Sequence, residues 1–239
     1  MNWATECAVI IPCLNEAGTI GSLVQAVRQH IPTVIVVDDG STDETAMLAE
    51  QAGAEVIRHT RPSGKGAALN AGWRRAFERG FKWALAMDGD GQHSPGDISG
   101  MLAYAEREDA ALVVGNRMGN ASRMPWLRRL VNRWMSKRIS KLAAQPFPDT
   151  QCGFRLMRLA AWSTLPMDTT HFEIESELLL GFAAAGHRVR FFPIEVIYKD
   201  ERSKIHPWRD TRRWLRWWWR ARKKFSNSKP IKPIAGKDR

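Results

Sequence analysis

The feature that most constrains the fold is a series of short, β-branched runs that alternate with helical patterns along the first half of the chain. Each run is too short for a typical helix and nearly continuously apolar, so it predicts a strand buried on both faces. These runs are residues 8–12, 34–37, 55–57, 83–87 and 112–115. Strands that alternate with helices form parallel sheets covered on both faces. We therefore predict an α/β fold with a mostly parallel, Rossmann-like sheet flanked by helices.

Acidic residues directly follow two of these runs. Asp38 and Asp39 come after residues 34–37, and Asp88 comes after residues 83–87. Parallel sheets bind ligands beyond the carboxyl ends of their strands. We therefore expect these carboxylates to converge at one edge of the sheet.

The segment from Asp88 to Gln92 places two carboxylates and an amide at alternate positions, with glycines between them. Alternate side chains of an extended or turn backbone point the same way, so Asp88, Asp90 and Gln92 can present oxygens to one point. Mg²⁺ and Mn²⁺ prefer such oxygens, combined with substrate phosphates and water. A plain polar turn is the alternative, because Asp and Gly are ordinary turn residues. An EF-hand is excluded, since Ser99 stands where its last glutamate would be.

The positive charge of the chain is confined to its end. The net charge is +11, and residues 199–239 hold 15 Lys/Arg against 4 Asp/Glu, which leaves residues 1–198 neutral. A localised excess of this kind indicates an anionic partner for that segment and not a property of the fold.

Nothing in the sequence predicts export or a membrane span. Residues 1–6 are polar and lead straight into a strand-like run, which is not the pattern of a signal peptide. No apolar stretch approaches the roughly 20 residues that cross a bilayer. The three cysteines, Cys7, Cys13 and Cys152, form no metal-binding or disulfide pattern. We expect a cytoplasmic protein with reduced thiols, attached to the membrane peripherally if at all.

A second basic segment precedes the end of the chain, since residues 117–141 contain eight Lys/Arg and no acidic residue. Its apolar side chains recur at helical spacing, at Leu127, Leu130, Val131, Trp134, Ile139 and Leu142. This pattern predicts a basic amphipathic helix. Residues 172–186 predict another helix, and residues 188–198 return to strand-like alternation.

Tryptophan and basic residues dominate residues 208–225, which hold five of the eleven tryptophans and eight Lys/Arg. A helix there would carry one apolar stripe: Trp214, Trp217, Trp218, Ala221 and Phe225. Interfacial tryptophan beside Lys/Arg is typical of a helix that lies on an anionic membrane. A helix packed on the domain itself or on a partner protein is the alternative. Nucleic-acid binding is disfavoured, although Trp beside Arg also binds single strands, because the body of the chain is neutral.

A set of short motifs occurs in order along the chain, at residues 9–16, 36–43, 65–72, 88–93, 114–117, 149–155 and 172–178. Together they resemble the family 2 glycosyltransferases of the GT-A fold, and the last three resemble the dolichyl-phosphate mannose synthase branch. The resemblance covers about residues 7–205. We therefore divide the chain into a GT-A domain at 1–205, a membrane-surface helix at 206–226 and a disordered tail at 227–239.

The resemblance implies a nucleotide-sugar site. Its residues would be Pro12, Leu14, Glu16, Asp39, Lys65, Asp88 and Gly89. Asp39 would contact the base, and Asp88 and Gly89 would lie on the ribose side. The resemblance also implies that Asp88, Asp90 and Gln92 bind Mg²⁺ or Mn²⁺, which offsets the charge that grows on the leaving nucleoside diphosphate.

The resemblance further implies phosphate- and acceptor-binding residues at Arg117, Arg128, Asn132, Arg202 and Lys204. Guanidinium groups suit phosphate because their planar fork donates two hydrogen bonds. Arg129 is an alternative to Arg128, and Asn132 stands where the family usually has Ser. Catalytic roles are implied for Asp90, Arg117, Asp149 and Glu177.

The implied function is inverting, metal-dependent transfer of a sugar from a UDP- or GDP-sugar to a lipid-linked acceptor, foremost polyprenyl phosphate. Such a phosphate is already ionised and needs no strong base. A hydroxyl of another lipid or glycan would need one, for which Asp149, Glu175 and Glu177 are candidates. Asp149 and Glu177 could instead be structural partners of Arg155. A non-catalytic membrane-surface binding protein is a further alternative, which the intact metal-binding triple disfavours.

Overall fold

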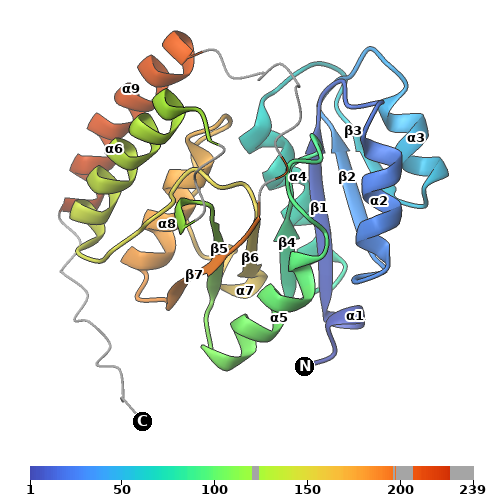
Figure 1. Cartoon of the computed structure of the whole chain (residues 1–239), viewed down its shortest axis with the longest axis horizontal. Helices are drawn as coiled ribbons and strands as arrows, with labels where there is room; N and C mark the ends of the chain where they lie inside the picture. The colour runs from blue at the N-terminus through green and yellow to red at the C-terminus, as the bar shows by residue number, and fades with distance from the viewer. Residues whose placement is uncertain (120–123, 196, 198–206, 227–239) are drawn as a thin grey trace.

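The computed structural model describes residues 1–119, 124–195, 197 and 207–226. One mixed sheet runs through its centre in the order β3-β2-β1-β4-β6-β5-β7 (Figure 1). The strands are β1 (Cys7–Cys13), β2 (Val34–Asp38), β3 (Glu55–Arg58), β4 (Trp83–Ala86), β5 (Leu112–Asn116), β6 (Arg155–Arg158) and β7 (Val189–Pro193). The helices are α1 (Trp3–Glu6), α2 (Ile20–Arg28), α3 (Thr45–Gln51), α4 (Lys65–Glu78), α5 (Asp97–Arg107), α6 (Trp126–Ala143), α7 (Leu159–Trp162), α8 (Ile174–Ala184) and α9 (Pro207–Ser226).

The predicted α/β class and mostly parallel sheet are confirmed. Parallel pairing joins β3 to β2, β2 to β1, β1 to β4 and β5 to β7. The strand missed by the sequence analysis is β6, which runs antiparallel between β4 and β5. It reads Arg-Leu-Met-Arg, and a run with two apolar residues gives no strand signal by itself. It forms a strand because it pairs with β4 on one side and with β5 on the other.

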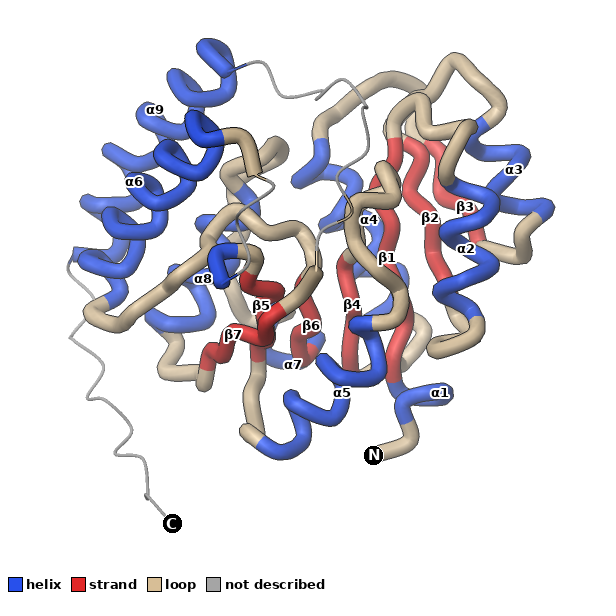
Figure 2. The backbone as a smooth tube through the Cα atoms, in the orientation of Figure 1, coloured by secondary structure: helices blue, strands red, loops and turns tan. Residues whose placement is uncertain are grey.

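Helices cover the sheet on both faces (Figure 2). On one face α4, α7 and α8 contact one another, and α4 packs directly on β1 and β2. That packing is close because Gly72 of α4 has no side chain, and a Cβ there would collide with Ile10 of β1. α2 and α3 pack together beside β2 and β3, and His30 after α2 lies 3.1 Å from Ser99 of α5.

The helix α6 confirms a helix in the basic segment, but most of its predicted apolar stripe is not buried. Its core-facing residues are Asn132, Met135, Ser136 and Ile139. The expected apolar stripe is instead largely in solvent, with Leu127 56% and Leu130 58% exposed. The helix therefore contacts the interior of the domain with two polar and two apolar side chains and leaves these leucines in solvent.

The helix α9 directs most of its predicted apolar stripe toward the domain and not toward solvent. Trp214, Trp217 and Trp218 are 2%, 4% and 6% exposed, because α9 packs against α6 and α8. The Trp214 ring stacks on Trp218 at 5.5 Å and meets Trp134 of α6 at 5.4 Å. This stripe therefore binds the domain and does not face a membrane. Among the described residues, no helix is both long and apolar enough to span a bilayer.

Docking of α9 can be tested with two adjacent tryptophans, since Trp218 is 6% and Trp219 is 68% exposed. We expect Trp218→Ala to lower the free energy of opening α9 by about 3 kcal/mol, because it leaves a cavity at the contact with the domain. Hydrogen exchange of the α9 amides should then be faster by about 100-fold. Trp219→Ala is the matched control and should change exchange little; equal effects of the two would contradict this packing.

Candidate active site

The loops that follow β1, β2 and β4 are hydrogen-bonded to one another at the carboxyl edge of the sheet. The Asn15 carboxamide accepts from the Thr42 amide at 2.9 Å, and the Glu16 amide donates to the Thr45 hydroxyl at 2.7 Å. The Thr19 hydroxyl donates to the Gly89 carbonyl at 2.8 Å. The segments predicted to line the nucleotide site, from Pro12 to Glu16 and around Gly89, are thus brought together.

Asp39 fixes the turn that leads into α4. Its carboxylate accepts from the amides of Ser63 and Gly64 at 2.9 and 2.7 Å, and its Oδ1 lies 2.7 Å from His59 Nδ1. Gly64 has a φ of +102°, a conformation that glycine adopts without strain. Asp39, predicted to contact the base, therefore also determines where Lys65 begins the helix.

Lys65 lies between two carboxylates from distant parts of the chain. Its ammonium is 2.6 Å from Asp88 Oδ1 and 2.5 Å from Glu175 Oε1 on α8. Burial alone would lower the pKa of Lys65, but Asp88 and Glu175 outweigh it and hold the pKa above its usual value. Burial would raise the pKa of Asp88, and Lys65 with His93 reverses that effect. The sequence analysis placed Lys65 beside the donor but did not pair it with Glu175.

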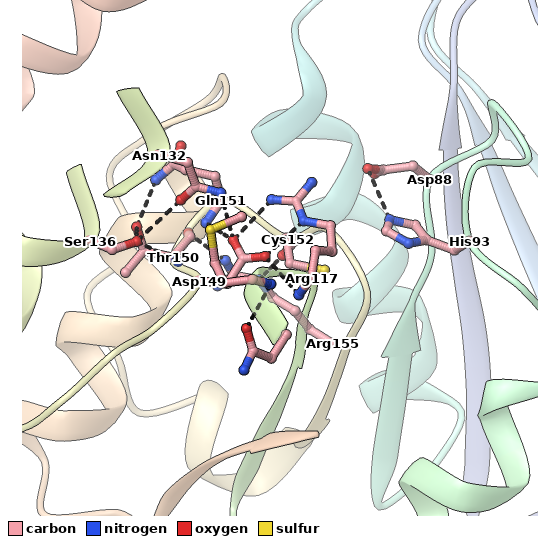
Figure 3. Close-up of polar contacts among 12 residues, drawn as sticks. Asp88, His93, Arg117, Asn132, Ser136, Asp149, Thr150, Gln151, Cys152 and Arg155 are labelled. Atoms are coloured by element: carbon pink, nitrogen blue, oxygen red, sulfur yellow. Dashed lines mark hydrogen bonds and ion pairs between the residues drawn. The ribbon is translucent and has the colours of Figure 1, made fainter. Parts of the chain in front are cut away.

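Asp88 is further confined by its neighbours. His93 Nε2 lies 3.7 Å from its Oδ2 (Figure 3), and the His93 ring stacks on Phe154. A Cβ on Gly153 would lie only 2.6 Å from Asp88 Oδ1. Gly153 was part of a recognised motif, but its role is visible only in the structure, because β6 brings its segment against the loop after β4.

The carboxylates of Asp88 and Asp90 offer hard oxygen ligands for a divalent cation. Burial, followed by the charge of Asp88, raises the pKa of Asp90, and an added cation would relieve both effects. The backbone N–H of Gln92 donates to Asp90 Oδ1 at 3.0 Å and fixes the turn. Across the part of the chain that the structure describes, no three His, Cys, Asp or Glu side chains form a complete metal site. Two carboxylates are a ligand set that fits Mg²⁺ or Mn²⁺ shared with substrate phosphates.

Arg117 and Asp149 form a buried ion pair beyond the end of β5 (Figure 3). Arg117 Nε and Nη2 donate to the two Asp149 oxygens at 2.7 and 2.9 Å. Asp149 is fully buried and also accepts from Asn132 Nδ2 at 3.0 Å. Burial would raise the pKa of Asp149, but Arg117 outweighs it and holds the pKa at about 2.

The structure shows what Asp149, Asn132 and Arg155 contact within the domain. Asp149 holds Arg117 in place, and its oxygens are occupied, since it also accepts from the amides of Arg117 and Gln151. Asn132 donates to Asp149 and accepts from Ser136, and its contact with a phosphate stays a prediction. Arg155, the partner considered as an alternative for Asp149 and Glu177, donates to the backbone carbonyls of residues 150, 152 and 175.

Glu177, which the resemblance implies to be catalytic, contacts the loop before α8. It accepts from the amides of Asp168 and Thr169 and from the Thr169 hydroxyl at 2.7 Å. Its carboxylate thus holds a loop, while Glu175, two residues earlier, contacts Lys65. Arg128 and Arg129 both lie half-buried in the first turn of α6. Arg202, Lys204 and the predicted disordered tail at 227–239 lie outside the described residues.

Comparisons with known proteins show the family of this chain. The sequence pattern of "Glycosyl transferase family 2" matches residues 8–165. This chain belongs to that family. Glycosyltransferase AglJ of Haloferax volcanii is 30% identical over 84% of this chain and 67% of its own length. A UDP-N-acetylglucosamine–dolichyl-phosphate N-acetylglucosaminyltransferase of Methanococcus voltae is 27% identical over 80% of this chain and 86% of its own.

Solved structures match the fold. Glucosyl-3-phosphoglycerate synthase from Mycobacterium tuberculosis, in complex with Mn²⁺, UDP-glucose and phosphoglyceric acid, superposes with a TM-score of 0.68 at 20% identity. The match covers 93% of this chain and 81% of that one. The GT-A architecture is therefore shared, and this chain is a family 2 glycosyltransferase.

Removing one partner of the buried pair should destabilise the protein far more than removing one partner of an exposed pair. We expect Asp149→Asn to lower the free energy of unfolding by about 3–5 kcal/mol, because it leaves the Arg117 charge buried without its partner. Asp109→Asn is the control: it removes the pair between Asp109 and Arg158, which are 71% and 43% exposed, and should cost less than about 1 kcal/mol. Urea unfolding measures both, and similar losses would contradict the structural role of Asp149.

Proposed function

We propose that this protein transfers a sugar from a UDP- or GDP-sugar to a polyprenyl phosphate, with inversion and with Mg²⁺ or Mn²⁺. The observation that favours a phosphate acceptor is the state of Asp149. This motif carboxylate is saturated by donors and has a pKa of about 2, which makes it a poor general base. An acceptor that is already ionised needs none. The relative named for transfer to dolichyl phosphate supports this acceptor class.

The chain's own residues would supply binding and charge balance. Pro12, Leu14, Glu16 and Gly89 line the donor side, and Asp39 holds the turn that carries Lys65. A cation held by Asp88, Asp90 and Gln92 would supply Lewis-acid stabilisation of the departing diphosphate.

Arg117 is the residue best placed to bind the acceptor phosphate. Asp149 fixes its Nε and Nη2, so the guanidinium is oriented before any ligand arrives. A pre-oriented donor costs little reorganisation when charge moves. The acceptor oxygen would attack the anomeric carbon in line, forming the new C–O bond as the bond to the nucleoside diphosphate breaks. Arg128, Arg202 and Lys204 remain proposed phosphate contacts.

We infer a peripheral position on the cytoplasmic face of a membrane. The three cysteines are free and buried, as in a reducing compartment.

A hydroxyl acceptor is the second candidate. Glu175 is the carboxylate that favours it, since it lies beside Lys65 and Asp88.

The donor assay tests the transferase directly. Nucleotide release is measured with polyprenyl phosphate and a panel of UDP- and GDP-sugars, with and without Mn²⁺. We expect one donor to give metal-dependent release, and Asp90→Asn to reduce the rate by about 100-fold or more because a ligand of the cation is lost. Asp109→Asn serves as the exposed-carboxylate control. Release that is independent of both metal and Asp90 would rule out this mechanism.

Gly153 provides a test that removes no functional group. We expect Gly153→Ala to weaken Mn²⁺-dependent nucleotide binding by about tenfold, because the added Cβ displaces Asp88. Gly21→Ala is the control, since a Cβ there meets nothing closer than 3.8 Å. Calorimetry with the nucleoside diphosphate measures both. Unchanged binding in Gly153→Ala would mean that the position of Asp88 does not matter for the nucleotide.

A further inference from the structure

Exposed apolar side chains are concentrated on two neighbouring helices. Of the eleven large hydrophobic residues exposed in the described part of the chain, seven lie on α6 and α9. The most exposed are Trp126 at 70%, Trp219 at 68%, Leu130 at 58% and Leu127 at 56%. The two helices lie side by side at one end of the molecule, outside the sheet (Figure 1). We call their solvent-facing side the α6–α9 surface.

The same surface is strongly basic. α6 contains six Lys/Arg and no acidic residue, and α9 contains eight with a single Asp. Several basic side chains are exposed beside the apolar ones, among them Arg133, Lys137 and Arg138 on α6 and Arg216 and Arg220 on α9. Arg138 lies over the Trp134 ring at 4.8 Å from its centroid. Exposed Trp and Leu among basic side chains fit the interface of an anionic bilayer.

The inner sides of the two helices reach the polar network around Asp149. Asn132 of α6 donates to Asp149, the partner of Arg117. Trp214 of α9 donates to the Ser176 hydroxyl at 3.2 Å, which also accepts from Gln151 Nε2 at 3.1 Å. Each helix therefore contacts the polar network around Asp149 on one side and solvent on the other.

We propose that the α6–α9 surface docks on an anionic lipid bilayer, with Trp126, Leu127, Leu130 and Trp219 inserted at the headgroup boundary. This rests on the proposed function in one respect: docking there would bring a membrane-held acceptor to Arg117. It differs from the expectation drawn from the sequence, because the buried stripe of α9 holds the helix to the domain and the opposite side meets lipid. The charge favours a bilayer over a second copy of this chain, since two copies would bring like charges together.

Flotation of the full chain with vesicles tests the surface without any sugar donor. We expect binding to vesicles of phosphatidylcholine mixed with phosphatidylglycerol, and much weaker binding to phosphatidylcholine alone. The double variant Leu127→Gln/Leu130→Gln should reduce partitioning by about tenfold, because it removes apolar side chains from the interface. Arg133→Gln/Lys137→Gln should reduce it by about tenfold or more through lost attraction to the anionic lipid.

The matched control removes similarly exposed apolar side chains from elsewhere. Met47 and Phe77 are each 44% exposed and lie on α3 and α4, so Met47→Gln/Phe77→Gln should bind vesicles as the wild type does. Circular dichroism and thermal melting confirm that each variant is folded. Equal loss in the control, or wild-type binding by both surface variants, would overturn the proposal.

Three outcomes distinguish bilayer docking from self-association and from the transfer activity. A wild-type dimer that the Leu127→Gln/Leu130→Gln variant dissociates, with vesicle binding unchanged, would assign the surface to a second copy and overturn the proposal. Metal-dependent transfer with no vesicle binding would refute the surface and leave the proposed function standing. Vesicle binding that depends on the surface residues, with no transfer from any donor, would support the surface and refute the function.

Discussion

The ion pair between Arg117 and Asp149 is the interaction on which the second half of the domain depends. Both groups are buried, and neither charge is tolerable there alone. Asp149 also gathers Asn132 of α6 and the amide of Gln151. One carboxylate therefore joins the end of β5, the first half of α6 and the segment that leads into β6, and it fixes the orientation of the guanidinium that we propose binds the acceptor phosphate.

On the proposed donor side lies a second cluster of charged residues, in which carboxylates outnumber basic groups. Lys65 carries one positive charge between Asp88 and Glu175, with Asp90 close behind. An excess of carboxylate over ammonium is suited to taking up a divalent cation together with a diphosphate, since the two bring opposite charges. The two clusters follow β4 and β5, the strands that flank β6. The segment that leads into β6 touches both, because Gly153 lies against Asp88 and the Gln151 amide donates to Asp149.

The outer helices extend this organisation to the surface. α9 is held by Trp214, which reaches Ser176 at the base of the Asp149 network. α6 supplies Asn132 from its inner side and exposed leucines from its outer side. α6 buries two polar side chains, Asn132 and Ser136, beside Met135 and Ile139, and it leaves Leu127 and Leu130 exposed, which would be unfavourable in water alone. The network that α6 completes accounts for its buried polar residues, and the proposed contact with a bilayer would account for its exposed leucines.

The sequence by itself determined the α/β class, the strands that are continuous apolar runs, and the acidic residues at their carboxyl ends, because periodicity and strand-end position are local properties. The tertiary structure alone decided three things. It made residues 155–158 a strand, through pairing on both sides. It paired Asp149 with Arg117 and Lys65 with Glu175, which are contacts between distant segments. It also selected which side of α6 and of α9 is buried, because an amphipathic pattern shows that a helix has two faces but not which one its neighbours cover.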